Sequence, residues 1–470
     1  MQAPFKDTLH QLKNRLHRKR YRCRSLEARL RRREAQIVEL RTERDMLAAR
    51  LAPRPLPHHH YPVQMIALAV FIVSQAGGSL RGAAKTVAYF ARLMGWDYGA
   101  PSHATIDNWT RRLGLYCLEH EAAPVGRYAA IIDESIQIGA ERCLLLLGVP
   151  LPDTHRRLAP LDRSCVRVLG VQVGRSWKSA EIATFLRRCL GAKPYLQLAY
   201  VISDGGRNLL AALRSLELDT VSDCTHLLTR CLKRGLADHA PLSRLAAFMG
   251  TYRRDRLLGR FGHLAPPTLR DKDRFLRIFL ILDWVDRLRS GWSALSTAEQ
   301  QSLAYLNRAE TLQLLEELRQ LRRLVSSAAA ILKTSGLNAA ARRAWQQRLA
   351  DYRASLTLCP LAEQLAAAVS DYFEQHAELI RKHERLLCCS DIIESTFGTY
   401  KNKGGMQVIS SDVLYLPLLG RTINADLVTK GLRTVSQPLV EQWNKQYTCD
   451  NRYRQLRRLR QRAKAATAVA

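Results

Sequence analysis

Three widely separated carboxylates stand at positions where an acidic side chain could do chemistry. Asp133 interrupts the apolar run "AAIIDESI", Asp204 ends the apolar run "LQLAYVIS", and Glu394 lies far downstream in a segment with helical periodicity. A carboxylate in a buried strand costs free energy unless it is paired or binds a metal. Strand ends in open α/β sheets are also where sites form. We therefore expect the three carboxylates to converge at one edge of a sheet.

Such a cluster would suit phosphodiester chemistry. Carboxylate oxygens are hard ligands for two Mg²⁺ ions, for which Mn²⁺ can substitute. Two ions about 4 Å apart can activate a water or a 3′-hydroxyl and stabilise the leaving oxygen of a phosphodiester. Each carboxylate alone could equally be a turn former. Glu134 competes with Asp133, because side chains alternate along a strand and only one of the two can face the site, and Asp219 and Asp391 are further alternatives.

The elements that would position these residues form an α/β domain. Residues 128–139, 142–151 and 165–174 read as strands, and a helix over 178–191 and a strand over 196–203 follow. A second helix, a short strand at 219–222 and a helix from 224 come next, which predicts a mixed sheet. This core spans 123–239 and resumes at 386–436. Residues 240–385 have only helical periodicity and predict an all-helical insertion.

Residues 1–51 predict a basic coiled coil. Apolar residues recur in steps of three and four, and the segment contains fifteen Lys or Arg but only six acidic residues. These apolar positions form a seam along one side of the helix, and a homodimer is the simplest way to bury it. A Pro/His-rich linker over 52–61 would end the helix. The seam positions are Phe5, Leu9, Leu12, Leu16, Lys19, Cys23, Leu26, Leu30, Arg33, Ile37, Leu40, Arg44, Leu47 and Leu51.

Residues 62–122 predict a helix-turn-helix region. Ser102 is a suitable N-cap for its last helix. The expected buried side of that helix holds Ile106, Trp109, Leu113 and Leu115. The side expected to face DNA phosphates and base edges holds Thr105, Asn108, Arg111 and Arg112.

The charge of the chain points to a polyanionic partner. Lys and Arg number 73 against 42 Asp and Glu, a formal net charge of +31, and residues 437–470 form a basic C-terminal tail. Nucleic acid is the leading candidate at this size. The first 50 residues are highly charged, unlike a signal peptide, and the longest apolar run covers only 65–73. We therefore expect a cytoplasmic, nucleoid-associated protein without membrane contact.

The order of Asp133, a hairpin, a helix, Asp204, a helical insertion and Glu394 resembles DDE transposases of bacterial insertion sequences. The resemblance covers about 128–240 and 385–405. It implies an α/β RNase H-like core with a large all-α insertion, preceded by a coiled coil and a helix-turn-helix region. It further implies Mg²⁺-dependent cleavage at the terminal repeats of a mobile element and strand transfer into target DNA. The family pattern favours Asp133 over Glu134 as the first carboxylate.

Two further residues fit that resemblance. His226 lies in the Asp-x-x-His pattern of "SDCTHLL", where many such enzymes carry a His near the scissile phosphate. Lys401 follows Glu394 by seven residues, about two helical turns, and in several insertion-sequence families a cation there grips the transposon-end phosphate. The alternative for His226 is an ordinary histidine at a capped helix start, and the alternative for Lys401 is a solvated lysine without a DNA contact. Ser390 stands where one subgroup has Arg, so the subfamily stays open.

Two other functions compete with strand transfer. A DNA-binding regulator or architectural protein could carry an inactive core of the same fold. A nuclease or junction resolvase could use the same carboxylates to cut without joining. Metal-dependent cleavage separates the first from an enzyme.

Overall fold

The structure is a computed structural model of the 470-residue chain. It describes residues 19, 22, 26, 27, 29–46, 52–120, 126–151, 161–193, 196–268, 277–401 and 408–469, without the side chains of 135, 136 and 463–469. The rest of the predicted coiled-coil segment lies outside the described residues.

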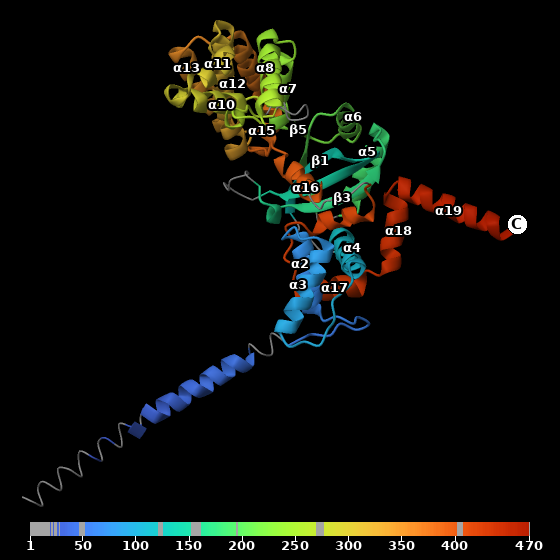
Figure 1. The fold of residues 1–470 in the computed structure, drawn as a ribbon. Helices are drawn as coiled ribbons and strands as arrows, with labels where there is room; N and C mark the ends of the chain where they lie inside the picture. Colours follow the sequence, from blue (N-terminus) through green and yellow to red (C-terminus); the bar gives the residue numbers. More distant parts are fainter. Residues whose placement is uncertain are drawn as a thin grey trace, which may run out of the picture.

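A five-stranded mixed sheet forms the centre of the molecule (Figure 1). Its order is β3-β2-β1-β4-β5, with β1–β2 and β2–β3 antiparallel and β4 and β5 parallel to β1. The prediction of an α/β unit with a mixed sheet is confirmed. The strands are β1 (Gly126–Ile138), β2 (Glu141–Pro150), β3 (Arg167–Gly174), β4 (Leu196–Ser203) and β5 (Thr220–Ser222).

Both faces of the sheet are buried, which explains the nearly continuous apolar strands. Ala130 and Ile132 of β1 pack with helices α5 (Ser179–Gly191) and α6 (Arg207–Ser215). Ala129 and Ile131 belong to the opposite core, which includes residues of helix α16 (Asp391–Lys401). Alternation along β1 then directs Asp133 to the α16 side.

The N-terminal helices and the C-terminal segment form one packed unit beneath the sheet. Helix α4 is its centre and contacts all the others. A side chain at Gly114 of α4 would place its Cβ 1.6 Å from the backbone oxygen of Leu414, so glycine permits this close approach. The elements are α2 (Val63–Ser74), α3 (Leu80–Leu93), α4 (His103–Glu119), η6 (Ser411–Leu418), α17 (Ala425–Thr434) and α18 (Gln437–Tyr447). Helix α19 (Arg452–Val469) projects away from it (Figure 1).

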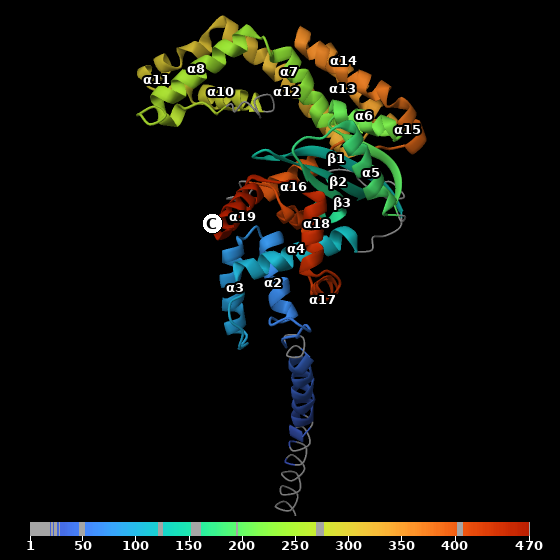
Figure 2. The ribbon, with the colours of Figure 1, turned by 90° about the vertical axis from the view of Figure 1, so that its right-hand side faces the viewer.

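A body of helices arches over the sheet (Figure 2). Helix α7 (Cys224–Leu236) packs against α12 and α14, so this body includes residues before 240, the predicted start of the insertion. The principal further helices are α8 (Ala240–Arg256), α10 (Leu280–Ser290), α11 (Thr297–Ser302), α12 (Ala309–Ser335), α13 (Ala339–Ser355), α14 (Pro360–Gln375) and α15 (Ala377–His383). Short 3-10 turns are η1 (Arg163–Cys165), η2 (Gly262–Leu264), η4 (Trp292–Ala294) and η5 (Ala304–Asn307).

The N-terminal helix, described continuously over 29–46, stands apart from the rest of the chain (Figure 1). Its seam residues Leu30, Ile37 and Leu40 are 60%, 48% and 63% exposed. An apolar seam left uncovered in one chain is what a helical partner would bury. None of the helices in the described part of the chain combines the length and apolar character needed to cross a membrane.

Candidate active site

The strand register brings two of the three predicted carboxylates together. Ile132 of β1 is paired with Ser203 of the parallel strand β4, so the next residues, Asp133 and Asp204, are neighbours where β4 ends and its pairing with β1 stops. Adjacent strands lie about 4.8 Å apart. Asp133 is only 5% exposed. Two of the three predicted carboxylates therefore meet at the end of β4, beside the middle of β1.

The turn after β4 orients Asp204. Gly205 has φ of +81°, a conformation that disfavours any residue with a Cβ. This turn brings the backbone N–H of Gly206 back to donate a 2.8 Å hydrogen bond to Oδ1 of Asp204. The positive φ of Gly205 therefore explains the glycine directly after Asp204.

Helix α16 packs on β1 and carries Glu394. Nε2 of His226, on α7, lies 3.3 Å from Oε1 of Glu394. This hydrogen bond raises the pKa of His226 to about 9, against the opposing effect of burial, and Asp223 and Asp204 raise it further. The imidazole is therefore a cation at neutral pH, set beside the carboxylates.

This pair predicts a pH dependence. The pKa of His226 in the metal-free protein should be about 9, compared with 6.5 for an ordinary histidine. Because the folded value is raised, the stabilising contribution of the pair is complete below pH 6.5 and is lost as the pH rises through about 9. NMR titration of the imidazole would measure the pKa, and Glu394→Gln should move it back toward 6.5. A wild-type pKa near 6.5 would contradict the pairing.

Asp223 fixes the two helices that carry this pair. Its Oδ1 accepts a 2.6 Å hydrogen bond from the N–H of His226, and its Oδ2 accepts one of 2.5 Å from the N–H of Ser390. The N–H of Cys224 also donates to the carbonyl oxygen of Cys388 at 2.8 Å. These bonds join the start of α7 to the segment that leads into α16. In the Asp-x-x-His pattern, then, the aspartate caps α7 while the histidine reaches Glu394.

The alternative acids have other partners. Asp391 pairs with Lys333 and accepts a hydrogen bond from Thr225, which together lower the pKa of its carboxyl. Asp219 pairs with Lys382, and hydrogen bonds from Lys382 and His383 lower its pKa.

Regular alternation would turn Glu134 to the opposite face from Asp133, and the register of β1 shifts between Asp133 and Ile136. It is half-buried, and burial raises the pKa of its carboxyl, with Asp204 adding to the effect and Arg142 opposing it. It therefore lies close enough to Asp204 to interact with it electrostatically.

A second acidic cluster is close by. Ligand atoms of Asp223, Cys389 and Asp391 lie within 4.8 Å of one another. Both oxygens of Asp223 accept backbone hydrogen bonds, and Asp391 is paired with Lys333. The carboxylates of Asp223 and Asp391 therefore join α7 to α16, and their oxygens are already bonded to protein groups instead of being free to bind a metal.

Two cations flank the carboxylates. Lys401 is exposed at the end of α16, roughly 10 Å along the helix from Glu394. Arg230, on α7, was not singled out from the sequence. A methyl group added at Gly205 would lie 3.3 Å from Nη1 of Arg230, which places this guanidinium beside the turn that holds Asp204. Its position four residues after His226, on the same helix face, is the signal that could have identified it.

The predicted outward face of α4 is partly wrong. Arg112 donates from Nε to the carbonyl oxygen of Val435 and from Nη2 to that of Leu432, both at 2.6 Å. Arg111 donates to Oγ of Ser411 and pairs with Asp107. Both guanidinium groups are half-buried because η6 and α17 pack over α4, so these arginines hold the C-terminal segment instead of facing outward.

The other two predicted DNA contacts lie in the first turns of α4. Thr105 accepts or donates a 2.9 Å hydrogen bond with Ser102, whose Oγ also caps the helix. Asn108 is exposed.

Helix α3 presents the larger exposed basic face. Arg81, Lys85, Tyr89 and Arg92 are all exposed and recur at helical spacing, and α3 contains no acidic residue. Its Ser79 N-cap accepts a hydrogen bond from the N–H of Gly82, and its buried side packs against α2 and α4.

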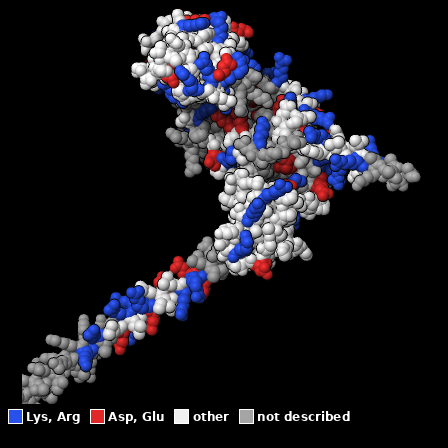
Figure 3. All heavy atoms as spheres, in the orientation of Figure 1, with Lys and Arg blue, Asp and Glu red and all other residues white. Residues whose placement is uncertain are grey.

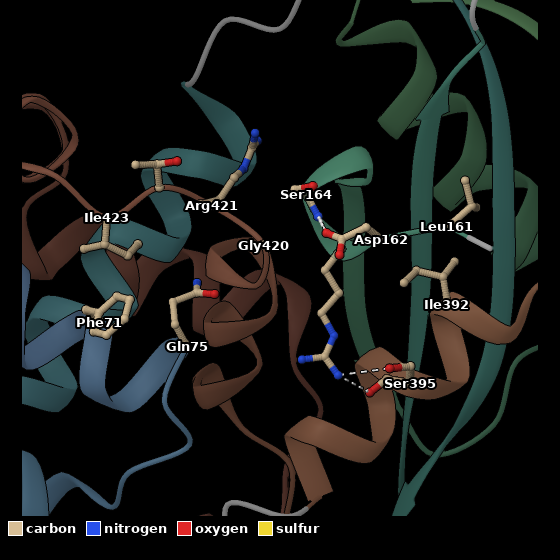
Figure 4. A pocket seen from close by; sticks show the side chains of 12 residues that line it. Phe71, Gln75, Leu161, Asp162, Ser164, Ile392, Ser395, Gly420, Arg421 and Ile423 are labelled. Carbon is tan, nitrogen blue, oxygen red and sulfur yellow. Dashed lines mark hydrogen bonds between the residues drawn. The ribbon is translucent and has the colours of Figure 1, made fainter. Parts of the chain in front are cut away.

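A cavity of about 720 Å³ separates α16 from the N-terminal helices (Figure 4). Arg163 reaches across part of it, and its Nη2 donates to Oγ of Ser395 at 3.0 Å and to Oγ1 of Thr399. Phe71 and Arg421 line the opposite side. The cavity therefore lies directly beside the residue that follows Glu394.

The donor set fits a hard divalent cation. Asp133, Asp204 and Glu394 offer only carboxylate oxygens, the ligands that Mg²⁺ prefers. Figure 3 shows Asp and Glu atoms gathered where the helical body meets the sheet, with Lys and Arg on the surfaces around them. No protein-family model matches the chain, and no curated protein matches it.

Proposed function

We propose that the protein is a DDE-type DNA transposase that binds the ends of a mobile DNA element, hydrolyses the phosphodiester and joins the 3′-hydroxyl to target DNA. The observation that carries this proposal is the strand register that makes Asp133 and Asp204 neighbours. Glu394 comes to the same sheet face on a helix packed against β1.

The sheet topology supports an RNase H-like core. The first three strands, β1 to β3, pair antiparallel. Strands β4 and β5 lie on the other side of β1 and run parallel to it, so β1 is the central strand. The helical body enters between β5 and α16, which is the position that the resemblance implies for an insertion.

Asp133, Asp204 and Glu394 would hold the metal. Mg²⁺ bound there supplies Lewis acidity for the attacking and leaving oxygens of a phosphodiester. His226 lies beside Glu394 and, when protonated, can donate a hydrogen bond to a phosphate oxygen. Arg230 and Lys401 lie on either side of the carboxylates and would bind neighbouring phosphates. Asp223 acts as a positioning residue, because it holds His226 and Glu394 at a fixed separation.

Duplex recognition falls to the N-terminal unit in this proposal. The exposed face of α3 and Asn108 of α4 offer cationic, aromatic and amide groups to DNA. The exposed apolar seam of the N-terminal helix supports pairing of two protomers, which would hold two element ends together.

The α3 face gives a direct prediction. An Arg81→Gln/Lys85→Gln variant should bind element-end DNA more weakly, with the slope of log K against log salt reduced by about 2, one for each lost phosphate contact. Fluorescence anisotropy over a salt series measures this. The matched control, Arg343→Gln/Arg348→Gln, removes two exposed arginines of α13 and should leave the slope within about 1 of wild type. An equal reduction of the salt slope in both variants would show that α3 does not contact the DNA.

Strand transfer is the experiment that tests the proposed function. Wild-type protein, Mg²⁺, a duplex with a pre-cleaved element end and a target plasmid should yield joined product. Cleavage of intact ends without any joining would identify a nuclease of the same fold. Tight binding with neither reaction across a range of divalent metals would identify a regulator with an inactive core.

A further inference from the structure

A second cationic site lies away from the carboxylates, in a groove between α18, α19 and the α4–η6 contact. The groove has a volume of about 550 Å³. Five cations and one carboxylate line it: Arg111, Lys445, Arg454, Arg457, Arg458 and Glu441. We infer that this groove seats backbone phosphates of the duplex that the active site cuts. The inference rests on the proposed function and adds a second DNA contact to it.

Three of the arginines are held in place by the protein. Arg454 donates to Oγ1 of Thr448 at 2.9 Å, and Arg458 pairs with Asp450 at 3.0 Å. Arg111 is fixed by its bond to Ser411 and its pair with Asp107. Because their geometry is already set, little side-chain entropy is lost when an anion binds.

The other two cations are available to a ligand. Lys445 and Arg457 are exposed, and no carboxylate in the described part of the chain forms an ion pair with either. Because Arg111 and Arg458 are already paired with Asp107 and Asp450, removing Lys445 and Arg457 should affect anion binding without breaking an internal contact.

The groove is tied to the carboxyl end of β3, a few residues beyond the level of Asp133 on β1. Strand β3 is parallel to β1, since both are antiparallel to β2, and the carboxyl ends of the two strands meet at one edge. Arg175 follows β3 and donates to the carbonyl oxygen of Asp450, which ties the α18–α19 junction to that edge. Strands β3 and β1 are two positions apart, roughly 10 Å, and Arg175 lies roughly 13 Å beyond the level of Asp133 along the strand direction. One duplex can therefore contact both the groove and the carboxylates.

Helix α19 extends the cationic surface away from the core (Figure 1). Arg457, Arg460 and Arg462 are exposed on it, and residues 452–469 contain no acidic side chain. Regularly repeated phosphates, rather than a single small anion, match a groove that continues into such a helix.

The test compares two double variants of the full-length protein in anisotropy titrations with an element-end duplex. Lys445→Gln/Arg457→Gln removes the two available groove cations. Arg343→Gln/Arg348→Gln removes the same charge from the exposed surface of α13, which lies outside the groove lining. We expect the groove variant to reduce the salt slope by about 2 and the control to reduce it by less than 1. Equal reductions, or no reduction by the groove variant, would overturn the inference.

Cleavage distinguishes this inference from the proposed function. If wild-type protein binds DNA through the groove but never cleaves or joins it, the groove inference stands and the transposase proposal is overturned. Cleavage at wild-type rates by a groove variant with unchanged affinity would overturn the groove alone. Wild-type protein that binds no duplex at all would overturn both.

Discussion

Glu394→Gln should cleave element-end DNA on the order of 10³-fold more slowly than wild type while binding it with similar affinity. Loss of a ligand carboxylate removes several kcal/mol of stabilisation from the charge that develops on the phosphodiester. The variant also deprives His226 of its partner. Single-turnover cleavage in Mg²⁺, with binding followed at a stated salt concentration, measures both effects.

Asp391→Asn is the matched control. Asp391 lies three residues earlier on α16, but it pairs with Lys333 and is 44% exposed. Its cleavage rate should stay within about tenfold of wild type, a change of about 1.4 kcal/mol in the barrier. If Asp391→Asn loses activity and Glu394→Gln retains it, the third carboxylate has been assigned to the wrong residue.

Asp223→Ala should weaken the junction between α7 and α16 by roughly 3–5 kcal/mol, because two buried N–H groups lose a charged acceptor. Asp223 is completely buried, so water does not replace the lost oxygens. Amide hydrogen exchange at His226 and Ser390 reports the free energy of opening.

Two further variants make this prediction specific. Asp223→Asn keeps one acceptor and sets an amide against the other N–H, so it should also destabilise the junction. Asp286→Asn breaks an exposed pair with Arg319 and should change exchange by less than about 1 kcal/mol. Unchanged exchange in both Asp223 variants would mean that Asp223 does not hold the helices.

The strands were predictable because each is apolar on both faces and bounded by turn residues. The predicted strand over 196–203 coincides with β4, and the one over 128–139 differs from β1 by two residues at most. The meeting of Asp133 with Asp204 followed from the same pattern, because each aspartate comes directly after an apolar run and the two runs pair as parallel strands.

The contacts of α4 and of Asp223 with distant segments were not predictable. The partners of Arg112 lie more than 300 residues downstream, and nothing near α4 in the sequence indicates that α17 packs on it. The bond from Ser390 to Asp223 spans 167 residues. A local pattern identified Asp223 and His226, but only the three-dimensional structure gave their separate tasks.

The most direct test of the carboxylate site is cleavage of a fragment that carries the native element end, in Mg²⁺, by wild type and by Asp204→Asn. We predict that wild type cuts at the element border and leaves a 3′-hydroxyl, while Asp204→Asn binds equally well and leaves the fragment intact. Cleavage by Asp204→Asn at the wild-type rate would contradict the metal site that Asp133, Asp204 and Glu394 are proposed to form.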